Sequence, residues 1–573
     1  MIIQTKQVGL LLCALALFVG VGFLIGKQQK STVISATSSD LPVWTAPVSL
    51  ENNQYGAYLS GFLAQQNQDY DRMTASFEKA LAIDSDNEKL KTTVYLLKAV
   101  QGKIDEALPL AASLGSIKKP ELLTDYVLIA NAFKRGDYDG TLHLLKTKTH
   151  YGPDRVLKPA LRAWAYAGQN KKAAAEKELE VFNKPQSKQL YLYYRALLAL
   201  AFDDRDGANK FFRRMMKDPA ESYPSLTAVV FVRDFYMARG EWKTGLPAYD
   251  RLIPFLQRTP SVRDVIQEMK SPKQMTPQIG AAIAFYDVSV ALAPLKTEET
   301  SLILNELAIY LAPDALTPKI WGGELLESAG NNRAANRVYD RIPHPNDVIM
   351  LKKVMNFIAV ENYTDVLPLL QTLLDHNPED AFLYRLAGEI YTERKEYATA
   401  IDFYKKSVAL FKKMGLSEET GRTLFALGAV YDAAKQRTLA EQAFLESVRL
   451  YPNNAQALNY LGYIWLEQNK NIDEAFQLVS SAAQLEPDDP NITDSLALGY
   501  YRKGDYTRAL ELAEQSIDRL SYSSVAYTHL GDIYAALGRH REAKYQYRKA
   551  LDLTADMTPE LKLDLHKKSG LSR

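Results

Sequence analysis

Cysteine and histidine are scarce in this sequence. Among 573 residues there is one cysteine, Cys13, and there are seven histidines. A single cysteine excludes internal disulfide bonds and cysteine-rich metal sites, and no two histidines show the spacing of metal ligands. The 69 basic residues nearly balance the 68 acidic ones, so the net charge is +1. This balance excludes the broad basic surface that is typical of nucleic-acid-binding proteins, and we predict no nucleic-acid partner.

The motifs of common catalytic sites are also missing. There is no H-E-x-x-H zinc-protease motif, no C-x-x-C redox motif, no G-x-S-x-G nucleophile turn and no G-x-x-x-x-G-K-[ST] phosphate loop. Paired carboxylates such as Asp488 and Asp489 are expected at helix starts, where they cap backbone N–H groups without an acid–base role. We therefore predict that the protein is not an enzyme and has no cofactor and no bound metal.

One long apolar run is present, at the N-terminus. Residues 8–26 carry no charge and are flanked by Lys6, Lys27 and Lys30. At ~1.5 Å per residue this length just spans a hydrocarbon layer of ~30 Å, whereas the apolar region of a secretory signal is usually about 7–15 residues. We predict an uncleaved transmembrane helix over residues 8–26, behind a tail of residues 1–7. The alternative is a cleaved signal peptide with its cleavage site near Ala36.

Cys13 lies inside this run, and its neighbours argue against lipid attachment. Leu12 precedes it, where lipoprotein signals need a small residue, and uncharged residues continue to Gly26. Cys13 is therefore predicted to be a small apolar residue of the helix. Residues 27–53 are rich in Ser, Thr and Pro without helical periodicity, and they are predicted to form a linker.

Beyond residue 53 the sequence repeats itself. The clearest unit, residues 381–410, carries Tyr384, Ala387, Gly388, Tyr391, Ala400 and Tyr404, and the later units keep the same spacing. The equivalent alanines are Ala400, Ala440, Ala475, Ala509 and Ala543, which are 40, 35, 34 and 34 residues apart. This pattern resembles the tetratricopeptide repeat (TPR), a pair of antiparallel helices. Its small residues let the two helices approach closely, and its aromatic residues fill the gap to the next pair.

Weaker units of the same kind occur upstream. We predict an all-α TPR superhelical solenoid of about 12–13 helix pairs, in which each repeat is stabilised by its neighbours and not by one central core. The predicted parts after the linker are a degenerate TPR half (54–253), a proline-rich break (254–278), degenerate helical repeats (279–380), clear TPR repeats (381–556) and a C-terminal capping helix (557–573).

In TPR proteins the first helix of each pair lines a concave groove. The resemblance assigns groove positions on the clear repeats, which are candidates for peptide binding because aromatic residues can anchor a peptide and charges can set its register. The candidates are Arg385, Glu389, Glu393, Arg422, Phe425, Asp432, Asn459, Tyr463, Glu467, Asp494, Tyr501, Arg502, Thr528 and Asp532.

Residues 457–553 carry a more specific resemblance. From ALNYLGYIWLEQNKNIDEAFQLV to VAYTHLGDIYAALGRHREAKYQYRKAL, they resemble the C-terminal part of a family of long bacterial envelope TPR proteins, which includes the LbcA-type adaptors of carboxy-terminal processing proteases. The resemblance implies a scaffold anchored in the membrane, with its body in the periplasm, that docks a protease or a murein hydrolase together with its substrates. The best-known member of that family is a lipoprotein, and the chain departs from it at Cys13.

Two other interpretations remain open. One is the LapB type, a membrane-anchored TPR protein with a cytoplasmic body that regulates lipopolysaccharide synthesis. That type ends in a cysteine-rich metal knuckle, and this chain has no cysteine after position 13. The other is a structural TPR subunit of a secretion, pilus or polysaccharide-export assembly. The flanking lysines are too few to fix the orientation of residues 8–26 in a membrane.

Overall fold

The structure is a computed structural model, and it describes residues 54–66, 69–115, 123–146, 152–217, 226–241, 270–293, 298–553, 557 and 559–570. The predicted tail (1–7), anchor (8–26), linker (27–53) and most of the proline-rich break (254–278) lie outside these residues. The described residues form 28 α-helices and two short 3-10 helices and contain no strand. The prediction of an all-α fold is confirmed for this part of the chain.

Contacts divide the described residues into two compact units, one up to Leu369 and one from Leu370. The boundary lies inside α20 (Tyr363–His376). The helices of the N-terminal unit are α2 (Gln54–Gln66), α3 (Tyr70–Ile83), α4 (Glu88–Val100), α5 (Ile104–Leu114), α6 (Thr124–Lys134), α7 (Tyr138–Leu144), α8 (Asp154–Gly168), α9 (Lys172–Leu179), η2 (Glu180–Phe182), η3 (Pro185–Ser187), α10 (Lys188–Ala201), α11 (Arg205–Lys217), α12 (Leu226–Ala238), α15 (Pro277–Leu292), α16 (Glu298–Leu311), α17 (Leu316–Ser328), α18 (Asn332–Tyr339) and α19 (Asp347–Ala359).

The C-terminal unit continues as helix pairs with a last single helix. Its helices are α21 (Ala381–Glu393), α22 (Tyr397–Met414), α23 (Ser417–Ala433), α24 (Arg437–Leu450), α25 (Ala455–Glu467), α26 (Ile472–Leu485), α27 (Pro490–Arg502), α28 (Tyr506–Ile517), α29 (Ser524–Ala536), α30 (His540–Asp552) and α31 (Pro559–Ser569). In the described parts of the chain, five pairs precede α12 and eight follow it, in agreement with the predicted 12–13 pairs. None of the helices described here is long and apolar enough to cross a membrane.

The small and aromatic residues of the repeat motif bring the two helices of a C-terminal pair into close contact. A methyl group added at Gly428 of α23 would lie 2.6 Å from the Phe444 ring of α24, and one at Gly531 of α29 would lie 2.5 Å from Tyr547 of α30. These glycines are therefore needed where the partner helix presents an aromatic ring. Side-chain caps start the first helices α21, α25, α27 and α29. In α25, Asn454 accepts a hydrogen bond from the backbone N–H of Ala457 at 3.1 Å.

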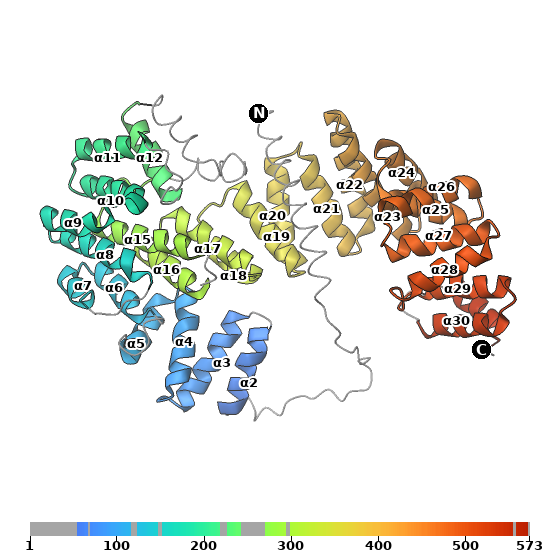
Figure 1. Cartoon of the computed structure of the whole chain (residues 1–573), viewed down its shortest axis with the longest axis horizontal. Helices are drawn as coiled ribbons and strands as arrows, with labels where there is room; N and C mark the ends of the chain where they lie inside the picture. The colour runs from blue at the N-terminus through green and yellow to red at the C-terminus, as the bar shows by residue number, and fades with distance from the viewer. Residues whose placement is uncertain are drawn as a thin grey trace. The chain divides into compact units, whose positions relative to one another are not determined.

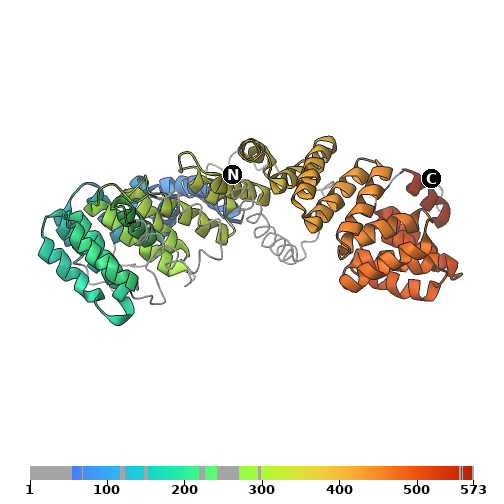
Figure 2. The same cartoon turned by 90° about the horizontal axis from the view of Figure 1, so that it is seen from above.

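The N-terminal unit departs from a simple solenoid because its repeats surround two helices of the same chain. α15 contacts α6, α8 and α10, and α16 contacts α4, α5 and α6. Figures 1 and 2 show α15 and α16 on the inner side of these N-terminal helices. Ten consecutive residues of α15, 280–289, are buried, as are nine of α16, 301–309. Apolar side chains on all faces are typical of such a central helix.

The prediction that neighbouring repeats alone stabilise the fold is therefore wrong for the N-terminal unit. One continuous hydrophobic core extends from Tyr95 to Ile349 and includes residues of both inner helices. The packing against α15 is tight, since a methyl group at Gly280 would lie 2.1 Å from the Trp164 ring of α8. On α16, the Tyr310 hydroxyl donates a hydrogen bond to Asp105 at 2.6 Å, and Lys134 lies 3.6 Å from the centre of the Tyr310 ring.

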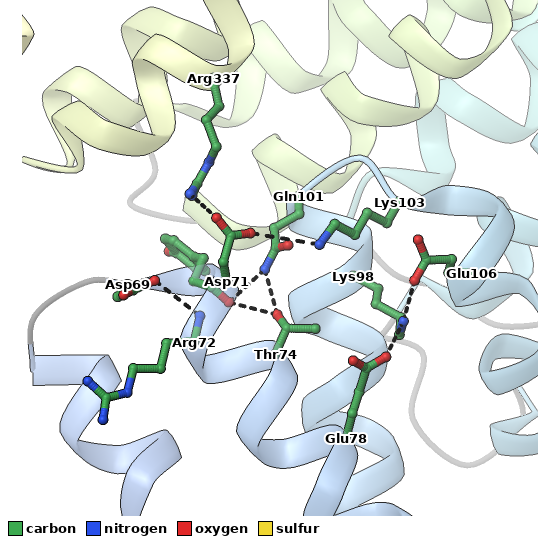
Figure 3. Close-up of polar contacts among 11 residues, drawn as sticks. Asp69, Asp71, Arg72, Thr74, Glu78, Lys98, Gln101, Lys103, Glu106 and Arg337 are labelled. Atoms are coloured by element: carbon green, nitrogen blue, oxygen red, sulfur yellow. Dashed lines mark hydrogen bonds and ion pairs between the residues drawn. The ribbon is translucent and has the colours of Figure 1, made fainter. Parts of the chain in front are cut away.

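The first pair of the N-terminal unit, α2 and α3, also meets the pair of α17 and α18. Arg337 of α18 donates a hydrogen bond to Asp71 of α3, and Lys103 lies 3.8 Å from the same carboxylate (Figure 3). Next to this ion pair, the Gln101 amide donates to the Tyr70 carbonyl at 3.0 Å and to the Thr74 hydroxyl at 2.6 Å. The N-terminal unit is therefore a closed arrangement in which repeats far apart in sequence are in contact.

Candidate functional site

The first helices of the C-terminal pairs form one face, which we call the inner face. It consists of the side chains of α21, α23, α25, α27 and α29 that face away from the second helix of each pair. First helices of neighbouring pairs contact each other more extensively than second helices do, as between α25 and α27 or α27 and α29. In a curved stack the helices on the concave side are the closer ones, so the inner face is the concave side. Within the C-terminal unit, the described helices that contact α21, α23 and α25 extensively belong either to the same pair or to a neighbouring pair.

All fourteen predicted groove residues lie on these five helices. Their exposure differs and places them in three groups. Glu389, Glu393, Arg422, Asp432 and Glu467 are exposed; Arg385, Phe425, Tyr463, Tyr501, Arg502 and Asp532 are partly buried; Asn459, Asp494 and Thr528 are buried. Their role in peptide binding stays a prediction, but the local contacts separate the inner face into two parts.

The part formed by α25, α27 and α29 contains a buried ionic cluster. His529 Nδ1 lies 2.8 Å from Asp494 Oδ2, and His529 Nε2 lies 3.5 Å from Glu467 Oε1. Burial alone would lower the pKa of His529, but the two carboxylates more than offset it and raise this pKa to about 10. Hydrogen bonding from His529 in turn lowers the pKa of Glu467. The imidazole is therefore a cation at neutral pH and links three successive inner helices.

The last helix closes the same part of the inner face. Lys568 of α31 lies 2.9 Å from Asp532 of α29, and the Tyr547 hydroxyl donates a hydrogen bond to the same carboxylate oxygen at 2.7 Å. Leu565 of α31 is buried in the hydrophobic cluster of the last pair. The groove candidate Asp532 is thus engaged by the chain itself.

Two buried acceptors of the inner face have no donor. Asn459 and Asp494 occupy the same repeat position on α25 and α27, and their side chains are only 6% and 7% exposed. The Oδ1 atom of each accepts no hydrogen bond from the described part of the chain. A buried acceptor without a partner costs free energy, about 1–3 kcal/mol.

The cations in the other part, on α21 and α23, are held by neighbouring carboxylates. Arg385 donates a hydrogen bond to Glu419 at 2.5 Å, and Arg422 donates to Glu418 at 2.7 Å. Glu389 stays 3.9 Å from Arg385, and its side chain is 53% exposed. The surrounding protein nevertheless raises the pKa of Glu389 by removing solvent. A carboxylate on the wall of a concave surface experiences this combination of open access and reduced solvation.

Sequence reasoning missed two residues of this site, His529 and Lys568. His529 is one position beyond the groove position of Thr528, and Lys568 lies in the terminal helix and not in a repeat. A buried ionisable residue in an inner helix is the signal that could have identified His529, because burial of a charge requires a partner. No group of His, Cys, Asp and Glu among the described residues is arranged to hold a metal ion.

The N-terminal unit offers a different feature, a largely apolar cavity of about 550 Å³. It lies between α12, α15 and the turn from α16 to α17, and its charged lining residues are Lys270 and Asp314.

Comparison with known proteins identifies the type of repeat. Models of the tetratricopeptide repeat match residues 379–453, 425–490 and 524–557. The chain contains tetratricopeptide repeats. They cover the helix pairs from α21 to α26 and the pair of α29 and α30, and such repeats form scaffolds for protein–protein interaction.

Individual relatives share only short stretches. The chain is 40% identical over 81 residues to the TPR repeat-containing protein PA4667 of Pseudomonas aeruginosa, which is 14% of each chain. It is 29% identical over 199 residues to cellulose synthase operon protein C of Xanthomonas axonopodis pv. citri, which is 33% of this chain and 12% of that protein. The chain thus aligns with about an eighth of the length of these curated relatives. Among solved structures, the APC/C hetero-tetramer Cut9-Hcn1 aligns over 92% of this chain and 99% of that one, at 14% identity and a TM-score of 0.36.

Proposed function

We propose that this protein is a non-enzymatic scaffold that binds other proteins through the inner face of its C-terminal repeats. The observation that carries the proposal is that Glu389, Glu393 and Asp432 are exposed on the first helices of matched tetratricopeptide repeats. Aromatic side chains such as Tyr463 can pack against a bound peptide. The N-terminal repeats serve a different purpose, because α15 and α16 occupy the side on which a groove would lie.

We further propose that the scaffold works in the bacterial cell envelope, held by residues 8–26, with its repeats in the periplasm. In that place it docks a protease or a cell-wall enzyme and brings substrates to it. The apolar run and the resemblance of residues 457–553 to envelope adaptors support this proposal. A reporter enzyme fused to the C-terminus, active only in the periplasm, tests the location. Activity of a cytoplasmic reporter at the same position would contradict it.

Site-specific crosslinking tests the docking function. A photoreactive amino acid replaces the exposed Tyr460 of α25 in the full chain, and the same amino acid replaces the exposed Glu511 of α28 as the control. Crosslinks at position 460 to one protease or murein hydrolase, absent at position 511, support the adaptor. Crosslinks to subunits of an export assembly would instead favour a structural role, the second candidate, which the similarity to cellulose synthase operon protein C suggests. Equal crosslinking at both positions would contradict binding by the inner face.

A further inference from the structure

The first helices of the C-terminal unit differ in charge from the second helices behind them. α21, α23 and α25 together carry six acidic and two basic residues, a net charge of −4. Their partners α22, α24 and α26 carry five acidic and six basic residues, a net charge of +1. The chain as a whole is nearly neutral, so the negative charge is concentrated on one side of these three pairs. Such an asymmetry produces a local field that attracts a cationic partner.

The two basic residues of these first helices are each paired with a carboxylate of the chain itself. Arg385 is 2.5 Å from Glu419, and its guanidinium also lies 5.2 Å from the centre of the Phe382 ring. Arg422 is bound by Glu418 at 2.7 Å and by the Tyr451 hydroxyl at 3.1 Å. Each arginine is therefore neutralised by the chain itself, and the positive charge on this part of the inner face is already paired.

Three carboxylates of the same helices remain open. Glu393 and Asp432 are exposed and form no ion pair among the described residues, and Glu389 reaches only the arginine that Glu419 already holds. Aromatic rings lie beside them. Tyr460 of α25 is 38% exposed, and its ring centre lies 5.7 Å from that of Phe425. Loss of solvent and, to a smaller extent, the charge of Asp432 raise the pKa of Tyr460. Carboxylates next to the faces of aromatic rings are the environment that an ammonium or guanidinium group prefers.

We propose that the inner face from α21 to α25 is a docking surface for a lysine- or arginine-rich segment of a partner protein. This proposal rests on the proposed scaffold function and specifies the chemistry of the segment that the scaffold recognises. Glu389, Glu393 and Asp432 bind its cationic side chains, and Phe425 and Tyr460 pack against them. The α27–α29 part of the inner face does not contribute such charges, because His529 and Lys568 neutralise its carboxylates internally.

Binding of defined peptides to the full chain tests this proposal. The probes are two fluorescein-labelled twelve-residue peptides, (Lys-Leu-Ser)4 and (Glu-Leu-Ser)4, with binding followed by fluorescence anisotropy at low and at high NaCl. We expect the lysine peptide to bind more tightly than the glutamate peptide and to weaken as salt screens the charges. Substituting all three carboxylates (Glu389→Gln, Glu393→Gln and Asp432→Asn) should weaken its binding about tenfold, since each exposed charge pair contributes only modestly.

A matched variant on the second helices controls for net charge. Glu474→Gln, Glu511→Gln and Asp518→Asn remove three exposed carboxylates from α26, from α28 and from the end of α28. Binding of the lysine peptide within twofold of the wild type is expected for this control. Equal weakening in both variants, tighter binding of the glutamate peptide, or no binding of the lysine peptide by the wild type would overturn the proposal. Crosslinking at position 460 that survives the inner-face substitutions would leave the scaffold function intact and reject only its basic-segment specificity.

Discussion

Arg337 of α18 and Asp71 of α3, 266 positions apart, form an ion pair that joins the last repeats of the N-terminal unit to its first. Lys103 approaches the same carboxylate from the turn before α5 (Figure 3). This contact lies at the surface, whereas α15 and α16 fill the interior of the same unit. The ion pair therefore marks where the arrangement closes, and the inner helices hold it closed.

The ion pair itself is predicted to contribute little to stability. Both side chains are about half exposed, so water and salt screen their attraction. Arg337→Ala should lower the free energy of unfolding by less than about 1 kcal/mol, and the difference should shrink further at 1 M NaCl. Chemical denaturation of the full chain, followed by fluorescence, measures both values. A loss of several kcal/mol would show that the closure depends on this contact.

The packing of α15 against α8 predicts a much larger effect. Gly280→Ala places a methyl group against the Trp164 ring and should destabilise the N-terminal unit by about 1–3 kcal/mol. Trp164→Phe removes part of the obstructing ring, so the double variant should be more stable than the two single costs predict, by about 1 kcal/mol. A double-mutant cycle of denaturant unfolding measures this coupling. Strict additivity would mean that the two residues do not restrict each other.

The stability of the C-terminal unit should depend on the protonation of His529. Its pKa is about 10 in the folded protein and near 6.5 when unfolded, so the folded state binds the proton more tightly. This contribution is fully present below pH 6.5 and is lost as the pH rises through 10. His529→Gln should cost about 3 kcal/mol at pH 6, because it leaves the Asp494 charge buried without its cation. The gap to the wild type should narrow by pH 10, and a gap that stays constant from pH 6 to 10 would contradict the ion pairs.

Asp380 is expected to behave in the opposite way to His529. Its buried charge destabilises the folded protein, so removal of that charge should stabilise it. It caps α21 by accepting hydrogen bonds from the N–H groups of Phe382 and Leu383, while no described residue donates to its Oδ2 atom. Burial raises the pKa of Asp380 from 3.8 to about 6, so the stability it provides at acid pH is lost as the pH rises from 3.8 through 6. Asp380→Asn keeps the cap without the charge.

The comparison of Asp380→Asn with the wild type therefore depends on pH. At pH 7.5 the variant should be more stable by about 1 kcal/mol or more, since each unit of pKa shift corresponds to about 1.4 kcal/mol. At pH 4 the two proteins should be nearly equal. Asp489→Asn at the start of α27, a less buried cap, is the matched control. A variant that is less stable than the wild type at pH 7.5 would show that the charged form of the cap is needed.

The C-terminal repeats can be predicted from the sequence because their motif residues contact each other within a single helix pair. Gly428 faces Phe444 and Gly531 faces Tyr547 within single pairs, so a fixed spacing is enough to identify each contact. The fourteen groove candidates lie on first helices for the same reason. The contacts of His529 were not predicted, since Glu467 and Asp494 approach it from two other repeats and no local pattern records that.

The arrangement of the N-terminal unit could not be predicted from repeat spacing. The segment from Pro277 to Leu292 is apolar on all faces, which indicates a helix buried on every side but not which elements bury it. The contact between Tyr310 and Asp105 joins residues 205 positions apart, and a repeat pattern describes only neighbours. Repeat spacing therefore predicts two sets of repeats separated by the break at 254–278, whereas α15 and α16 return to pack against the earlier repeats.

The inner position of α15 and α16 also sets the order in which the protein can be made. The N-terminal repeats leave the ribosome first, but the helices that complete their core end at Leu311 and emerge much later. Until then the inner surfaces of α4, α6 and α8 are uncovered and prone to aggregation. The repeats from α21 onward need only their neighbours, so each can fold as it emerges. Evolution can therefore lengthen or shorten the C-terminal array one repeat at a time, whereas the N-terminal unit must keep its number of repeats.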